Sequence, residues 1–237
     1  GDSHGAEPLV CLQPPRCPRG FSDVPTDRDS ILRRSLSLPI SRLVPIIGRM
    51  PGAAILESAP GFGAAGRWSI LAAHPRLIFE ATGSSWRLKI DDRPTETGFG
   101  DGLEQLARLL TTYDLAQPGR PSTADPEVSP FQGGMIGFFG YDLAPRLERL
   151  PRKAGRASRL PDIRFALYDS AVIVDNRTDR VDFHAFDLLG EGANSRERRW
   201  EQWDRALLCP TIDSGLFWMG PIRSNFSRAD YIAAVRR

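Results

Sequence analysis

Residues 165–188 read FALYDSAVIVDNRTDRVDFHAFDL, and this stretch decides the fold class. It contains two runs rich in Val, Ala and aromatic residues, 165–176 and 180–188, on either side of a polar turn from Asn176 to Asp179. Two such runs around a short polar turn predict a β-hairpin. The sequence therefore indicates a β-rich fold with antiparallel pairing.

Other strand-like runs precede this hairpin. Residues 53–59 predict a buried strand between two Pro-Gly pairs, and a Gly-rich loop follows it. Three further runs, at 67–73, 76–82 and 85–91, are separated by short turns. Consecutive strands at short spacing favour an antiparallel sheet. The run at 131–143, FQGGMIGFFGYDL, predicts a strand in which glycines mark bulges or close backbone approach.

Helical patterns flank the strands. Apolar residues recur at i, i+3, i+4 and i+7 over 102–114, which predicts an amphipathic helix with Asp101 as its N-cap. A short helix over 42–50 is compatible with Pro45 only in a first turn. A third helix is predicted over 195–208, and its tryptophans are expected to anchor the core.

The composition excludes several classes of protein. Of the 237 residues, 41% are hydrophobic and 25% charged, which excludes a disordered chain. The net charge of +2 is too small to favour a nucleic acid or a membrane surface. No apolar run approaches the roughly 18 residues that span a bilayer. We therefore expect a cytoplasmic protein that binds neither nucleic acid nor membrane.

The cysteines predict no metal or redox site. Cys11, Cys17 and Cys209 form an odd set, and the C-x5-C spacing fits no usual zinc or redox motif. We expect free thiols in a reducing compartment, with a bridge between Cys11 and Cys17 as the alternative.

The two ends of the chain differ from its centre. Residues 1–25 are Pro-rich without an apolar period, which predicts a disordered tail or a remnant of expression. Ser227 is placed to cap a final helix, with Asp230 at its third position. That helix reaches Arg237 without a stop signal, so we expect the sequence to be cut within an element.

Several motifs are weak evidence for function. Residues 61–66 read G-x-G-x-x-G, but strand-like residues follow the third glycine where a dinucleotide site needs a helix. The histidines, His4, His74 and His184, are scattered, and we expect structural roles for them. The basic stretch 149–164 favours a solvated loop over a site for an anionic ligand. We predict no catalytic residue and no metal ligand in this chain.

Glu57 and Ser58 form a more promising pair. A carboxylate and a hydroxyl stand together at the end of an apolar strand, just before a Gly-rich loop. Such a pair, with loop amides, can hold the ammonium and carboxylate groups of a small ligand. The alternative interpretation is a simple cap on a turn at the strand end.

Several phrases together resemble the N-terminal region of the large subunits of anthranilate synthase and aminodeoxychorismate synthase. The resemblance covers roughly residues 36–237 and depends on the order of its pieces, since each one alone is weak. The pieces are Ala54-Ile55-Leu56-Glu57-Ser58-Ala59, Gly66-Arg67-Trp68-Ser69, Pro130-Phe131-Gln132-Gly133-Gly134-Met135-Ile136-Gly137, Gly140-Tyr141-Asp142, Leu160-Pro161-Asp162, Tyr168-Asp169, Val174-Asp175-Asn176 and Asn225-Phe226-Ser227.

The resemblance implies an α+β fold of antiparallel, sandwich-like β-sheets with flanking helices, in agreement with the strands predicted above. It implies an N-terminal domain over 26–222 and the start of a chorismate-binding catalytic region over 223–237. It also implies that the complete enzyme aminates chorismate with Mg²⁺ and with ammonia from a glutamine amidotransferase subunit. The groups that hold chorismate and Mg²⁺ are expected beyond this chain, so the chain alone is expected to be inactive.

The resemblance also suggests an effector site. In this family the motif matched by Ile55 to Ser58 lines a tryptophan pocket that serves feedback inhibition. Leu56, Glu57, Ser58 and Arg67 are therefore candidate residues of a pocket for L-tryptophan, with its other wall outside this chain.

Two branches of the family remain open. Trp68 and the Gly-Phe-Phe-Gly-Tyr-Asp-Leu phrase favour aminodeoxychorismate synthase component I, which serves folate and para-aminobenzoate synthesis. The Ile-Leu-Glu-Ser motif is instead close to the tryptophan-sensing form and favours anthranilate synthase component I, which serves tryptophan synthesis. A third hypothesis, of another class, is a non-catalytic module that binds an aromatic amino acid and a partner subunit.

Overall fold

The computed structural model describes residues 31–59, 63–91, 93–113, 129, 131–144, 148, 160–208, 224–225 and 227–236. Its strands are β1 (Leu32–Ser35), β2 (Ala54–Leu56), β3 (Trp68–Ala72), β4 (Leu77–Thr82), β5 (Ser85–Ile90), β6 (Glu96–Phe99), β7 (Gly134–Phe139), β8 (Ile163–Tyr168), β9 (Ser170–Asp175) and β10 (Arg180–Ala185). Its α-helices are α1 (Ile40–Ile47), α2 (Gly102–Thr112), α4 (Ala193–Leu207) and α5 (Arg228–Val235), and short 3₁₀ turns lie at Gly63–Gly66 and Tyr141–Leu143.

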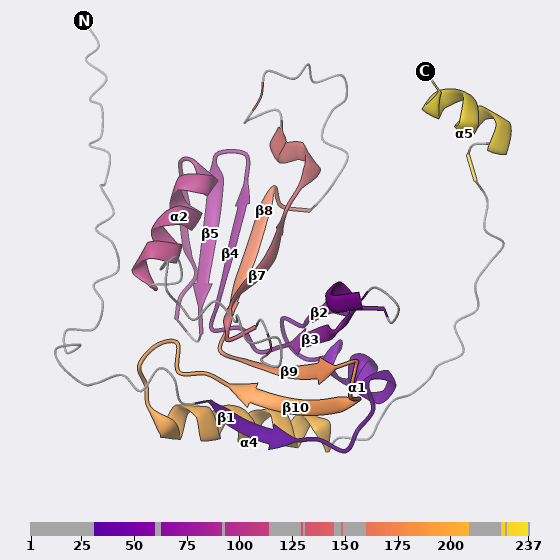
Figure 1. Cartoon of the computed structure of the whole chain (residues 1–237). Coiled ribbons are helices and arrows are strands. Elements are labelled where there is room, and N and C mark those ends of the chain that lie inside the picture. Colours follow the sequence, from indigo (N-terminus) through magenta and orange to yellow (C-terminus); the bar gives the residue numbers. More distant parts are fainter. Residues whose placement is uncertain are drawn as a thin grey trace, which may run out of the picture.

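The strands form two five-stranded antiparallel sheets. The β3 sheet has the order β1-β10-β9-β3-β2, and the β4 sheet has the order β6-β5-β4-β8-β7. Figure 1 shows the strands of the β4 sheet standing steeply above those of the β3 sheet. The chain passes between the sheets twice, from β3 to β4 and from β8 to β9. The β3 sheet is therefore built from two separate segments of the chain, one before and one after the β4 sheet.

The sequence predicts one strand over 165–176, and this prediction is wrong. The segment contains parts of two strands, β8 and β9, which belong to different sheets. β8 ends at Tyr168, β9 begins at Ser170, and Asp169 lies between them. The carboxylate of Asp169 accepts hydrogen bonds from Arg76 and Arg199, at 2.9 and 3.1 Å. These long-range contacts fix the corner where the chain changes sheets, which no local pattern reveals.

The hairpin of β9 and β10 is confirmed. Val174 pairs with Val181 and Asp175 with Arg180, so the turn closes over Asn176 to Asp179. Asp179 has a φ of 55°, a left-handed conformation that Asp tolerates in turns.

The core of the β4 sheet lies under α2, as Figure 1 shows. Leu106 and Leu109 of the helix are buried with Phe79 and Leu88 of the sheet. The Asp101 carboxylate accepts a hydrogen bond from the Leu103 amide at 3.0 Å, which confirms the predicted N-cap.

The core of the β3 sheet lies between the sheet and the helices α1 and α4. Leu43 and Ile47 of α1 are fully buried there together with Phe183 and Trp203. The Trp203 indole N–H donates to the Ser170 hydroxyl at 3.1 Å, so the ring fills the core and its polar atom is satisfied. The predicted role of the α4 tryptophans as core anchors is confirmed.

A third and smaller cluster joins the two sheets. Ala72 and Ile173 of the β3 sheet are buried against Ala166 and Tyr168 of the β4 sheet. The Tyr168 hydroxyl donates to the Gly52 carbonyl at 2.7 Å. The predicted α+β fold, with antiparallel sheets and flanking helices, is confirmed, and sandwich-like contact between the sheets lies in this cluster.

Three other predictions need correction. α1 begins at Ile40, so Pro45 lies inside the helix rather than in its first turn, and the burial of Leu43 and Ile47 offsets the missing hydrogen bond. β2 is a three-residue edge strand whose Leu56 is 48% exposed, so it is not a buried strand. The sequence patterns missed β1 and β6, both short edge strands without clean alternation.

The glycines of β7 mark close backbone approach, as predicted. A Cβ added at Gly137 would lie 2.0 Å from the Arg164 carbonyl oxygen and 2.6 Å from the Phe165 Cα. No side chain larger than hydrogen fits there while β7 pairs with β8.

Several predictions lie outside the described residues. These are the tail over 1–25, the three cysteines and most of the basic stretch 149–164. The predicted cap of α5 is present, because the Ser227 hydroxyl accepts from the Asp230 amide at 3.1 Å. No helix among the described residues is long and apolar enough to cross a membrane.

Candidate functional site

The predicted ligand pair lies where β2 ends, beside the start of β3. The Ser58 amide donates to the Ser69 hydroxyl at 3.0 Å. The side-chain amide of Asn176 donates to the Ser58 carbonyl, the Gly66 carbonyl and the Ser69 hydroxyl, at 3.3, 3.1 and 3.0 Å. One Asn side chain thus holds three segments together. We refer to Leu56, Glu57, Ser58, Ser69 and Asn176 as the Ser58 corner.

The Ser58 corner presents accessible side chains. Leu56 and Glu57 are exposed, and Ser58 is half-buried. The Ser58 hydroxyl donates only a long hydrogen bond, 3.4 Å, to the Ala65 carbonyl. A carboxylate and a weakly engaged hydroxyl on a fixed backbone can bind the polar ends of an amino acid.

Arg67 lies next to the corner but directs its guanidinium to Asp175. Nε donates to Oδ1 at 3.1 Å and Nη2 to Oδ2 at 2.8 Å, and both side chains are 9% exposed. These hydrogen bonds hold the pKa of Asp175 below its ordinary value, against the effect of burial. The Arg67 Cζ atom also lies 4.5 Å from the centre of the Trp68 ring. The structure thus keeps Leu56, Glu57 and Ser58 on one exposed edge, whereas the Arg67 side chain is buried against Asp175.

The Gly61 to Gly66 motif lacks the context of a dinucleotide site. Residues 63–66 form a 3₁₀ turn, and β3 begins at Trp68. No α-helix starts at the third glycine to offer its amides to a pyrophosphate. The prediction that a strand follows the third glycine is confirmed, because β3 begins at Trp68.

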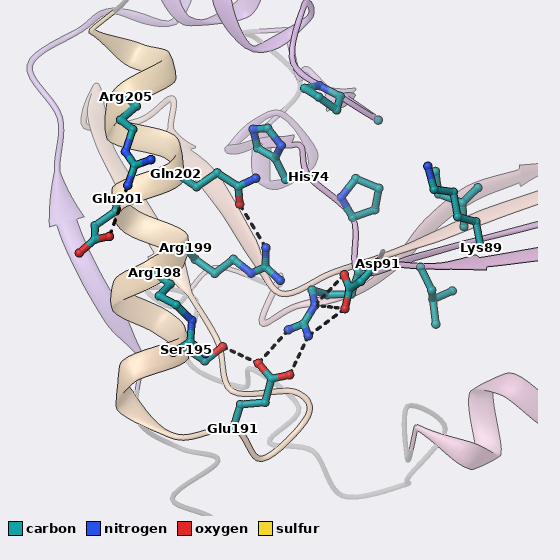
Figure 2. A pocket seen from close by; sticks show the side chains of 16 residues that line it. His74, Lys89, Asp91, Glu191, Ser195, Arg198, Arg199, Glu201, Gln202 and Arg205 are labelled. Atoms are coloured by element: carbon teal, nitrogen blue, oxygen red, sulfur yellow. Dashed lines mark hydrogen bonds and ion pairs between the residues drawn. The ribbon is translucent and has the colours of Figure 1, made fainter. Parts of the chain in front are cut away.

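A second place of interest is a cavity of about 740 Å³ between α4 and the ends of β4 and β5, shown in Figure 2. Arg76 is one of its lining residues and donates to three carboxylates: Nη1 to Asp169 at 2.9 Å, Nη2 to Glu191 at 2.7 Å and Nε to Asp91 at 3.1 Å. Sequence reasoning missed this cavity, because its residues come from four separate segments.

The ion pairs of Arg76 are strong ones. Hydrogen bonds from Arg76 lower the pKa of Glu191 to about 2, against the effect of burial. Burial opposes the charge of Arg76, but its hydrogen bonds to Glu191, Asp91 and Asp169 outweigh that effect and raise its pKa. Arg76 and Glu191 therefore both stay charged at neutral pH.

The histidines have structural surroundings. Burial lowers the pKa of His184 to about 4, with Arg33 and Arg180 adding to the effect and Asp182 opposing it. Burial, followed by the charge of Arg199, lowers the pKa of His74. Both imidazoles are therefore neutral at pH 7.

Comparison with known proteins finds relatives of two names. The chain is 31% identical to aminodeoxychorismate synthase component 1 of Salmonella typhimurium over 185 residues, which are 78% of this chain and 37% of the relative. It is 33% identical to anthranilate synthase component 1 of Mycobacterium tuberculosis over 159 residues, 67% of this chain and 30% of the relative. The chain is a homologue of component 1 of these two synthases.

The solved crystal structure of anthranilate synthase component I from Streptococcus pneumoniae is also similar to this synthase homologue. The identity is 25% and the TM-score 0.44, over 70% of this chain and 34% of that one. No family model matches the chain. The chain spans less than half of the length of the curated relatives compared with it.

Proposed function

We propose that this chain is the N-terminal part of component I of an aminodeoxychorismate synthase. The complete subunit replaces the 4-hydroxyl group of chorismate by an amino group and leaves the enolpyruvyl group in place. Ammonia comes from a glutamine amidotransferase subunit, and the product serves para-aminobenzoate and folate synthesis. The observation that carries the proposal is the similarity, over 78% of this chain, to relatives named aminodeoxychorismate synthase component 1.

The proposal leaves Mg²⁺ to residues outside this chain. No group of three His, Cys, Asp or Glu side chains in the described part is placed to hold a metal ion. The carboxylates of Asp91, Asp169 and Glu191 are engaged by Arg76. The residues described do not fit a magnesium site, so we derive no step of the reaction through them.

Within this function, the Ser58 corner is proposed to bind the amino-acid part of L-tryptophan. The exposed Glu57 carboxylate complements an ammonium group, and the Ser58 hydroxyl can exchange its 3.4 Å hydrogen bond for one to a carboxylate. Leu56, 48% exposed on the same edge, offers apolar contact to an aromatic ring. The site is regulatory in this proposal, because no acid and base pair stands at the corner.

Anthranilate synthase component I is the second candidate, since relatives of that name reach 33% identity. The full-length subunit that contains this chain, given chorismate, Mg²⁺ and ammonia, separates the two. An aminodeoxychorismate synthase forms 4-amino-4-deoxychorismate without anthranilate. Fluorescent anthranilate, formed with no lyase added, contradicts the first candidate and supports the second.

The third hypothesis, a non-catalytic binding module, has a separate test. L-Tryptophan is titrated calorimetrically into this chain and into the full-length subunit. Binding without any turnover of chorismate by the full-length subunit favours the module, whereas no heat in either titration removes the tryptophan site.

A further inference from the structure

The backbone of Ser58 lies beyond the regular pairing of β2. The register of β2 with β3 ends where Leu56 lies opposite Ile70, two residues before Ser58. Among the described residues, the Ser58 backbone makes its hydrogen bonds to two side chains. Its amide donates to the Ser69 hydroxyl at 3.0 Å, and its carbonyl accepts from the Asn176 amide group at 3.3 Å. The position of Ser58 therefore depends on these side chains rather than on a strand ladder.

Asn176 is fixed independently of the corner that it contacts. Its backbone amide donates to the Arg67 carbonyl at 2.7 Å. It directly follows Asp175, which ends β9, pairs with Trp68 and is held by the Arg67 guanidinium. These contacts belong to the β3 sheet and its edge, so the Asn176 side chain starts from a fixed point whether or not a ligand is bound.

The side-chain amide of Asn176 has every N–H engaged. Nδ2 carries two hydrogens, and it lies 3.0 Å from the Ser69 hydroxyl, 3.1 Å from the Gly66 carbonyl and 3.3 Å from the Ser58 carbonyl. Carbonyl oxygens can only accept, so a side chain without an N–H at position 176 leaves both of them without this donor. The Ser69 hydroxyl is fully buried and also accepts from the Ser58 amide, so its orientation depends on the same donor.

We propose that Asn176 is the positioning residue of the Ser58 corner. It sets the place of the Ser58 hydroxyl, and of the Glu57 carboxylate beside it, for the amino-acid part of the effector. This inference rests on the proposed function, because it needs the corner to bind L-tryptophan. Asn176 acts through the Ser58 backbone, directly from Nδ2 and indirectly through the Ser69 hydroxyl.

Two substitutions of Asn176 separate the effect of its N–H groups from the effect of its size. Asn176→Ala removes the side-chain amide, and Asn176→Asp keeps its shape but has no N–H to donate at neutral pH. Both are expected to weaken the binding of L-tryptophan to the full-length subunit about tenfold, measured by calorimetric titration. Wild-type affinity in Asn176→Asp would overturn the proposal, because the size of the side chain would then suffice.

A double-mutant cycle tests whether Asn176 acts through Ser58. Ser58→Ala alone is expected to weaken binding about fivefold. If Asn176 positions the same hydroxyl, the variant with both alanines binds about tenfold more weakly than the wild type, as Asn176→Ala alone does. A loss of about fiftyfold, the product of two independent effects, is what a general structural role of Asn176 gives, and it would overturn the proposal.

Ser69→Ala is a milder variant that leaves Asn176 unchanged. It removes only the hydroxyl that links Nδ2 to the Ser58 amide. We expect binding about threefold weaker than in the wild type. Wild-type affinity in this variant would overturn the route through Ser69.

Asn194→Ala is the matched control, since it removes the same amide group from an exposed position in the first turn of α4. We expect it to leave tryptophan binding unchanged, and thermal melts confirm that each variant folds. A wild-type subunit that binds no L-tryptophan removes the effector site of the proposed function, and this inference with it. Binding by the wild type with equal affinity in Asn176→Ala overturns this inference alone.

Discussion

Arg67 and Asp175 form a buried two-point ion pair, with Nε to Oδ1 at 3.1 Å and Nη2 to Oδ2 at 2.8 Å. Arg67 directly precedes β3, whose first residue, Trp68, pairs with Asp175 of β9, and the Asn176 amide donates to the Arg67 carbonyl at 2.7 Å. Asn176, the next residue after Asp175, donates to Ser58 and Ser69. The ion pair therefore holds Asp175 in place, and Asn176 beside it holds Ser58 and Ser69.

Removal of this ion pair is predicted to destabilise the fold. Asp175→Ala leaves the buried Arg67 guanidinium without its carboxylate, at a cost of about 3–5 kcal/mol. Urea denaturation followed by circular dichroism measures the loss. Glu104→Ala, which breaks an exposed pair with Arg108, is the control, and we expect it to change stability by less than about 1 kcal/mol. Equal effects of the two substitutions would contradict the structural role of Arg67.

The hydroxyl of Ser58 is predicted to serve the effector rather than the reaction. Ser58→Ala in the full-length subunit should weaken inhibition by L-tryptophan about fivefold, the value of one hydrogen bond, and leave the uninhibited rate unchanged. Ser85→Ala, at the exposed start of β5, is the matched control and should alter neither. A parallel fall in the uninhibited rate would count against a regulatory site.

Stability is predicted to fall in mild acid because of His184. Its pKa is about 4 in the folded chain and about 6.5 when unfolded, so only the unfolded chain takes up the proton between these values. The folded state therefore loses stability as the pH falls from 6.5 towards 4, by about 3 kcal/mol in total. His184→Gln removes the titrating group. Urea denaturation at several pH values should then show a free energy of unfolding that falls less steeply between pH 6.5 and 4. An unchanged slope would place the proton uptake elsewhere.

The close contact at Gly137 is predicted to be intolerant of a methyl group. Gly137→Ala puts a Cβ against backbone atoms of β8 and should cost about 1–3 kcal/mol or more. Gly83→Ala is the comparison, because its Cβ meets nothing within 4 Å and only its φ of 57° is unfavourable. We expect a loss of about 1 kcal/mol there. A smaller loss at Gly137 than at Gly83 would contradict the close approach of β7 to β8.

Local sequence patterns predicted the helices and strands whose stabilising contacts repeat over a few residues. The stripe of α2 and the polar turn between β9 and β10 are visible in sequence, since periodicity and turn chemistry act over a few residues. Asp169 shows what local patterns do not predict. It interrupts an apolar run by one residue, but its partners Arg76 and Arg199 lie far along the chain. The change of sheet at this point depends on those contacts.

The sequence likewise predicts some residues of the candidate site and not others. Glu57 and Ser58 were predicted from their place at a strand end, whereas the sequence indicated Asn176 only as the start of a turn and as part of a family phrase. The hydrogen bonds of Asn176 to Ser58, Gly66 and Ser69 depend on the pairing of β3 with β9. The cavity beside α4 gave no signal, because Lys89 and Arg198 each resemble an ordinary surface charge until the fold brings them to one cavity.

The most direct test of the central claim is the product formed by the full-length subunit from chorismate with Mg²⁺ and ammonia. Chromatography is expected to show 4-amino-4-deoxychorismate and no anthranilate. Formation of anthranilate without added lyase, or failure to consume chorismate at all, would contradict the proposed function.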